Sequence, residues 1–232
     1  MSGERYVPAA GRRFLAPLFD PVMAVTTRAQ RWRGRLVAET LATNPTTILD
    51  VGCGTGTLAV LLARRVPRAR VIGLDGDPDI LQRAAAKAEA AEVEVELLEA
   101  TADAIPLADA GVDCVVSSLV FHHLAPETKA RALAEIRRVL RPGGRLIIAD
   151  YGRPQDPLTR IAFLYVQLLH GFANTRQHAA GELPCLIANA GFNVKTINRL
   201  RTASGTLDLL AATRERDVER ASPTSTHPAV AP

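Results

Sequence analysis

The chain has 232 residues, of which 47% are hydrophobic and 22% are charged, and its formal net charge is +4. Such a length and balance are typical of one globular domain with a sizeable core. The sequence contains no run of about 18 apolar residues, so we expect no transmembrane helix. Aromatic residues make up 4% of the chain. They leave few side chains for stacking on bases, so we expect no nucleic-acid partner.

The basic residues and cysteines give predictions about the protein's surroundings. Arginines are densest near the N-terminus, where they indicate a solvated helix face; a patch for an anionic substrate, nucleic acid or a membrane surface is the alternative. The cysteines lie at Cys53, Cys114 and Cys185, without metal-ligand spacing. We expect Cys114 and Cys185 to be core thiols. This usage predicts a reducing, cytoplasmic location, and an N-terminal apolar run interrupted by Pro17 and Asp20 argues against a signal peptide.

The order of the elements predicts an α/β protein. Residues 1–42 are expected to form an N-terminal helical cap, with a break around Asp20-Pro21. Apolar strands then alternate with helices, and this alternation predicts right-handed crossovers in a sheet buried on both faces. The expected elements are a strand at 46–51, a helix at 57–66, a strand at 70–75, a helix at 78–91, strands at 93–99 and 112–118, a helix at 126–140 and a strand at 144–151.

A long amphipathic segment follows at 154–176. Its apolar residues recur at spacings of three and four, which predicts a helix with a wide and mostly buried apolar face. We interpret the segment as a helical lid insertion over an apolar substrate; a dimer face and plain core are the alternatives. A helix ending at Gly191, an antiparallel pair at 192–201 and 205–212, and a disordered tail at 214–232 complete the chain.

An acid and three alternate glycines join the first strand to the first helix of the alternation. They form the pattern D-x-G-x-G-x-G at residues 50–56. Glycine lets the backbone bend sharply and lets a ligand approach without a Cβ in the way. A second strand ends at Asp75, 25 residues after Asp50, where a carboxylate can accept hydrogen bonds from both hydroxyls of a ribose. The pattern therefore predicts a nucleotide-type site at the carboxyl ends of parallel strands.

Three further segments follow in a fixed order. They are T-A-D-A-I-P-L at 101–107, V-D-C-V-V-S-S at 112–118 and L-R-P-G-G-R-L at 140–146. Together with the glycine pattern they resemble the class I S-adenosylmethionine-dependent methyltransferases, over residues 36–213. The resemblance implies a Rossmann-like, doubly wound α/β fold whose seven-stranded sheet is mostly parallel, with a C-terminal antiparallel strand and helices on both faces. It also implies one methyltransferase domain at 43–213.

The same resemblance implies S-adenosylmethionine as the cofactor and a small molecule as the methyl acceptor. The core is similar to the ubiquinone/menaquinone-type methylases, which implies an apolar or lipid-like acceptor methylated by in-line displacement. A non-catalytic S-adenosylmethionine-binding partner or regulatory protein is the alternative. The residues implied at the cofactor are Asp50, Gly52, Cys53, Gly54, Gly56, Asp75, Gly76, Ile80, Ala102, Asp103, Ala104, Ser118 and Leu119.

Candidate groups for acceptor chemistry lie after the fourth and fifth strands and on the lid. His122 and His123 are candidate catalytic bases because histidine titrates near neutrality; a structural hydrogen-bonding role is the alternative. Asp150 and His178 are further candidates. The sequence contains no metal motif, so we predict no metal site, and it leaves a homodimer and peripheral membrane contact open. Substrate contacts are expected from Phe19, Tyr151, Tyr165 and His170.

Overall fold

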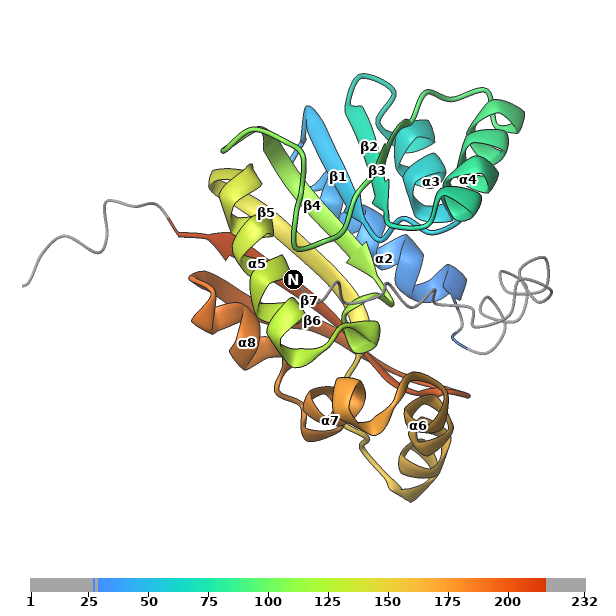
Figure 1. The fold of residues 1–232 in the computed structure, drawn as a ribbon, viewed down its shortest axis with the longest axis vertical. Coiled ribbons are helices and arrows are strands. Elements are labelled where there is room, and N and C mark those ends of the chain that lie inside the picture. Colours follow the sequence, from blue (N-terminus) through green and yellow to red (C-terminus); the bar gives the residue numbers. More distant parts are fainter. Residues whose placement is uncertain (1–26, 28, 216–232) are drawn as a thin grey trace, which may run out of the picture.

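The computed structural model describes Thr27 and residues 29–215, which form a sheet with helices on both of its faces (Figure 1). Seven strands make one sheet in the order β3-β2-β1-β4-β5-β7-β6. The strands are β1 (Thr47–Val51), β2 (Arg70–Asp75), β3 (Glu96–Glu99), β4 (Val112–Ser118), β5 (Leu140–Tyr151), β6 (Phe192–Thr202) and β7 (Gly205–Arg214). The helices are α2 (Ala29–Leu41), α3 (Thr57–Arg65), α4 (Pro78–Ala90), the 3₁₀ turn η2 (Phe121–His123), α5 (Pro126–Val139), α6 (Pro157–His170), α7 (Phe172–Ala180) and α8 (Leu183–Asn189).

The strand order reverses between β1 and β4. β1 pairs in parallel with β2 on one side and with β4 on the other, and β4 pairs in parallel with β5. β7 is antiparallel to both β5 and β6. The predicted mostly parallel sheet with a C-terminal antiparallel strand is therefore confirmed. In open α/β sheets the crevice at such a reversal, outside the carboxyl ends of the strands, is where ligands bind.

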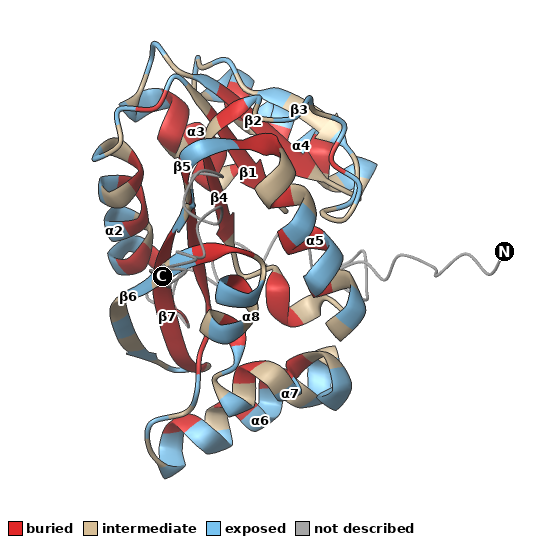
Figure 2. Ribbon diagram, turned by 90° about the vertical axis from the view of Figure 1, so that its left-hand side faces the viewer, coloured by how far each residue is buried: buried red, intermediate tan, exposed pale blue. Residues whose placement is uncertain are grey.

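Helices bury both faces of the sheet, and the buried strands run between the helical layers (Figure 2). Leu49 packs on one face with residues of α5 and α8, among them Ile136. Its neighbour Ile48 packs on the opposite face with residues of α2 and α3, among them Trp32. This alternation along β1 explains why the central strands are apolar almost throughout.

Two local expectations are wrong. β5 begins at Leu140 rather than at residue 144, because the Pro-Gly-Gly segment enters the strand through a bulge. Gly143 adopts a φ of 80° there, which glycine tolerates without strain. Cys185 is exposed rather than a core thiol, because α8 buries Leu183 and Ile187 on one face and Cys185 lies on the other.

The segment expected as a lid forms α6 and α7, but the apolar face of α6 is not mostly buried. Phe163 and Val166 pack against the core. Apolar residues cover more of the α6 surface than its one packed face, which explains the difference from the prediction. The large apolar side chains that stay 45–70% exposed are Leu158, Ile161, Leu164, Tyr165, Leu168, Leu169 and Phe172.

None of the described helices is long and apolar enough to span a membrane.

Some of the predicted features lie outside the residues that the structure describes. Of the predicted cap at 1–42, Thr27 and residues from Ala29 onward, including α2, are described. The expected break at Asp20-Pro21 and the substrate candidate Phe19 lie outside the described residues, as do residues 216–232 of the expected tail.

Candidate functional site

The glycine loop lies between the end of β1 and the start of α3. The backbone N–H groups of Gly52 and Cys53 both donate to the carbonyl oxygen of Leu74, at 2.7 and 2.9 Å. Gly52, Gly54 and Gly56 have φ values of 70°, 53° and 74°, a region that other residues enter only at a cost. The loop therefore needs glycine at all three positions for backbone reasons alone.

The three glycines differ in what surrounds them. A Cβ on Gly52 would overlap the side chain of Val120, and a Cβ on Gly56 would lie 2.9 Å from the Cβ of Ala84. A Cβ on Gly54 would meet no atom within 4 Å. Gly54 thus presents bare backbone to open space, as a ligand-contacting glycine does.

Asp75 joins the end of β2 to this loop. Its Oδ2 accepts a hydrogen bond from the Gly54 N–H at 3.0 Å, and its Oδ1 accepts one from the Asp77 N–H at 3.1 Å. The carboxylate is half-buried, as are Gly76 and Ile80 beside it. Asp75 therefore fixes the loop while it stands beside the open space at Gly54.

Asp50 is a fully buried acid at the centre of the sheet. Neither of its carboxylate oxygens has a hydrogen-bond partner within the described part of the chain. Burial, and next the negative charge of Asp75, raise the pKa of Asp50 to about 7, although the charge of Arg33 and the backbone N–H of Ala59, which is too poorly placed for a full hydrogen bond, lower it in part. A buried polar group without partners is rare in proteins and calls for an explanation. A cationic or hydrogen-bond-donating group of a bound ligand would supply one.

The segment after β3 brings Asp103 to the same edge of the sheet. Asp103 pairs with Arg131 of α5, whose Nε lies 3.0 Å from Oδ2. Although burial raises the pKa of Asp103, hydrogen bonds from Thr101 and Arg131 outweigh it and lower the pKa. Ala102 beside it is half-buried and Ala104 is exposed. Asp103 is thus a charged acceptor within reach of solvent.

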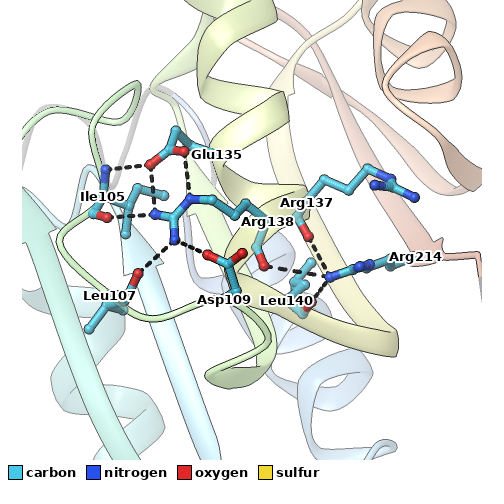
Figure 3. Close-up of polar contacts among 8 residues, drawn as sticks. All are labelled: Ile105, Leu107, Asp109, Glu135, Arg137, Arg138, Leu140 and Arg214. Atoms are coloured by element: carbon cyan, nitrogen blue, oxygen red, sulfur yellow. Dashed lines mark hydrogen bonds and ion pairs between the residues drawn. The ribbon is translucent and has the colours of Figure 1, made fainter. Parts of the chain in front are cut away.

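Arg138 of α5 holds the loop that follows Asp103 (Figure 3). Its guanidinium donates to the carbonyl oxygens of Ile105 and Leu107 and pairs with Asp109 at 2.7 Å. Glu135, one turn earlier on α5, pairs with Arg138 and accepts the Ile105 N–H at 2.9 Å. No sequence pattern indicates this contact, because an arginine three residues after a glutamate on a helix is equally typical of an ion pair on the protein surface.

Lys87 of α4 makes a second contact that the sequence does not predict. Its ammonium group donates to the hydroxyl oxygens of Thr55 and Thr57, at 2.8 and 2.6 Å. These hydroxyls flank Gly56, so the contact pins the end of the glycine loop to α4. No local pattern links Lys87 to Thr55, which lies 32 residues earlier.

The carboxyl ends of β4 and β5 meet at Asp150. This acid is fully buried, and it accepts hydrogen bonds from the N–H groups of Val120, Phe121 and Tyr151 at 3.1, 2.8 and 2.7 Å. Although burial raises the pKa of Asp150, the charge and hydrogen bond of His122 outweigh it, and the pKa lies below the usual range. Asp150 is therefore an anion held by three backbone N–H groups and His122, and this environment disfavours a role as a base.

The same acid shapes the turn that follows β4. Ser118 ends β4 half-buried, and the next residue, Leu119, has a φ of 59°, which is a genuine outlier for a bulky side chain. The Leu119 N–H donates to Ala149. A strained residue that the surrounding structure holds in place is a frequent feature of functional sites.

Histidines gather beside this turn. The ring centroids of His122 and His123 lie 4.1 Å apart, and His170 at the end of α6 lies 5.1 Å from the first and 4.2 Å from the second. His178 of α7 lies 6.2 Å from His122, and Tyr151 meets His122 edge-on at 4.9 Å. The structure thus brings together five of the residues expected to serve acceptor chemistry, namely His122, His123, Tyr151, His170 and His178.

Burial controls the charge of three of these rings. It lowers the pKa of His123 well below its usual value, and it lowers the pKa values of His170 and His178 to about 4 and about 3. All three rings are therefore neutral at neutral pH. Tyr165, by contrast, is 65% exposed, so its expected substrate contact would have to come from an acceptor lying on the surface of α6.

Comparisons with known proteins point to one class. Residues 48–144 match the family model described as a methyltransferase domain. Over 124 residues the chain is 44% identical to the demethylmenaquinone methyltransferase of Thermus thermophilus, covering 53% of this chain and 56% of that protein. The enzyme of the same name from Deinococcus radiodurans is 36% identical over 156 residues, which are 66% of this chain and 64% of the relative. The chain therefore spans less than two thirds of either relative.

Solved structures agree on the fold. The structure of an S-adenosylmethionine-dependent methyltransferase from Methanosarcina mazei superposes with a TM-score of 0.61 at 21% identity, covering 74% of this chain and 93% of that one. At this identity the likeness shows the fold alone.

Proposed function

We propose that the protein transfers a methyl group from S-adenosylmethionine to a small, apolar acceptor, a proposal supported by the match of residues 48–144 to a methyltransferase-domain model. The single observation that carries the proposal is the buried pair of unpartnered oxygens on Asp50 beside the open backbone of Gly54. A buried carboxyl group at this place suits the cationic amino group of the cofactor's methionine part, whose positive charge would favour the ionised form of Asp50.

The other cofactor contacts follow from the same edge of the sheet. Asp75 would accept from the ribose hydroxyls, and the free lone pairs of Asp103 would accept from the adenine amino group. Gly52 and Gly56 keep the loop in its bent form, and Ile80 would flank the adenine. The half-buried Ser118 and Leu119 would lie near the methionine end.

The protein's contribution to catalysis would be mainly positional. When bound, the cofactor supplies a methyl group on a sulfonium, which is already a good electrophile. Holding an acceptor in line with that group can supply about 7–11 kcal/mol at best, from orientation alone. The strained turn at Leu119, which Asp150 fixes through the Val120 and Phe121 N–H groups, is the element placed to orient the acceptor. The neutral ring of His123 could accept a proton from a weakly acidic acceptor.

The apolar nature of the acceptor is supported by α6 and α7. A groove of about 540 Å³ between them has apolar walls from Ile161, Leu164 and Phe172, with Arg160 and Arg176 beside them. Ligand sites commonly measure about 300–1,000 Å³ and have mostly apolar linings with a few polar groups. Two of the similar proteins are named for methylation of demethylmenaquinone, an acceptor of this apolar kind.

The test has two stages. Calorimetric titration with S-adenosylmethionine and S-adenosylhomocysteine should show micromolar binding of both, and Asp75→Ala should weaken it at least tenfold. Methyl transfer is then measured with labelled cofactor against quinols, phenols and lipids. Binding with transfer to an apolar acceptor supports the proposal. Absence of binding to either cofactor form would overturn it, and binding without transfer to any acceptor would favour a non-catalytic binding protein.

A further inference from the structure

Four of the five histidines of the chain lie in one cluster, formed by η2, the end of α6 and α7. One ring nitrogen from each of His122, His123 and His170 lies within 4.8 Å of the other two. We propose that these three imidazoles bind a divalent transition-metal ion of the zinc class. The sequence predicts no metal site, because His170 is 47 residues from His123 and no local spacing joins them.

The first argument is the orientation of His122. Its Nδ1 lies 2.8 Å from Oδ1 of Asp150, which leaves Nε2 as the nitrogen able to bind a metal. Metal-binding histidines almost always donate their second N–H to a carboxylate, a carbonyl or water. Asp150 is itself held by three backbone N–H groups and is fully buried. The outer shell that a zinc-bound imidazole needs is therefore built into the end of β5.

The second argument is the buried negative charge behind the rings. The Asp150 carboxylate is fully buried, and its Oδ1 lies 2.8 Å from Nδ1 of His122. A buried carboxylate at this distance favours a cation bound by the neighbouring imidazoles.

The third argument is reach. Zinc binds histidine nitrogen at about 2.0–2.1 Å, so two ligand nitrogens of a tetrahedral site lie about 3.3 Å apart. Small side-chain rotations would bring the ring nitrogens from their separations of up to 4.8 Å to this distance. His170 is the last residue of α6 and is followed by Gly171, whose φ is 87°. The ring therefore stands on a helix end rather than mid-helix, next to a residue that can adapt.

Three protein ligands leave one coordination position for water or for another oxygen ligand, as in catalytic zinc sites. The cluster follows β4 directly, and Val120 of the same turn faces Gly52 of the glycine loop. The open position could therefore take a hydroxyl or carbonyl oxygen of the acceptor. This last step rests on the proposed function, whereas metal binding itself does not.

The test uses the full chain without an affinity tag, stripped of metal and free of cofactor. Titration with zinc chloride should show one tight site per chain, and cobalt chloride should give the intense visible absorption of a four-coordinate ion. His170→Ala should weaken zinc binding at least a hundredfold and abolish that absorption. Leu169→Ala is the matched control: its side chain is 60% exposed and adjacent, so both signals should stay unchanged.

The outcomes separate the two proposals. Equal zinc affinity in the wild type and in His170→Ala, or weak binding at several sites without the cobalt signal, overturns the metal site. If His170→Ala is poorly folded, His123→Ala gives the same comparison from η2. A protein that binds S-adenosylhomocysteine but no zinc refutes the metal site alone. One that binds zinc in this pattern but no cofactor refutes the proposed function and leaves the metal site standing.

Discussion

Alanine at Gly54 should weaken cofactor binding at least a hundredfold while the fold survives, and alanine at Gly52 should mainly destabilise the fold. Both residues have positive φ values, 53° and 70°, so either substitution costs about 1–2 kcal/mol of backbone strain. At Gly54 the new methyl group meets no atom within 4 Å, and strain is the whole cost. At Gly52 it overlaps Val120, which adds about 1–3 kcal/mol of overpacking.

We therefore expect the free energy of unfolding to fall by about 1–2 kcal/mol in Gly54→Ala and by about 2–5 kcal/mol in Gly52→Ala. Urea unfolding without cofactor measures both. Calorimetric titration of Gly54→Ala with S-adenosylhomocysteine should show at least a hundredfold loss of affinity, equivalent to about 2.7 kcal/mol, because the methyl group occupies the space left open for the ligand. If Gly54→Ala binds S-adenosylhomocysteine with an affinity within threefold of that of the wild type, the cofactor does not approach this backbone and the proposed cofactor site is wrong.

Four further outcomes test other parts of the site. Asp75→Ala should weaken cofactor binding at least tenfold, since a hydrogen bond to a charged group contributes about 1.5–3 kcal/mol; unchanged affinity with an intact fold would exclude a ribose contact. Because burial raises the pKa of Asp50 from 3.8 to about 7, the folded state holds a proton that the unfolded state has lost. The stability of the cofactor-free protein should therefore fall as pH rises across that window, by up to about 4 kcal/mol, and Asp50→Asn should flatten the unfolding profile. Arg138→Leu should lower the free energy of unfolding in urea by about 2–3 kcal/mol, because the carbonyls of Ile105 and Leu107 lose their charged donor. A loss below about 0.5 kcal/mol, the scale of an ordinary surface substitution, would show that the loop does not depend on Arg138. Leu164→Ser and Leu168→Ser, at exposed positions of α6, should leave stability within about 0.5 kcal/mol but raise the KM for an apolar acceptor; an unchanged KM would remove α6 from acceptor binding.

The sequence predicts the parts of the fold that depend on local patterns of residues. Strand and helix positions follow from apolar runs and periodicity, and the bends at Gly52, Gly54 and Gly56 follow from a requirement for positive φ that glycine alone meets cheaply. Asp75 could be placed beside the glycine loop because the carboxyl ends of neighbouring parallel strands share one edge of a sheet.

Features that depend on distant contacts could not be predicted in this way. Periodicity shows that α6 has an apolar face, but it does not tell whether another element covers that face, and Leu158 and Leu168 remain 70% and 66% exposed. Arg138 holds the loop at 105–109 through carbonyl groups, which carry no sequence signal. The meeting of His170 with His122 and His123 requires the placement of α6, which packs on β7 near the end of the chain.

The histidine cluster also constrains the chemistry of the acceptor side. A ring nitrogen that binds a metal has no lone pair left for a proton, so a metal site and a base at the same nitrogen of His123 exclude each other. His122 has one nitrogen engaged with Asp150 and would have none free once a metal is bound. With zinc bound, activation of a hydroxyl acceptor would pass to the metal, which lowers the pKa of a bound oxygen acid. Zinc removal should then lower kcat with an acidic acceptor while cofactor affinity stays constant. Activity that survives zinc removal but is lost in His123→Ala would assign the base role to the imidazole.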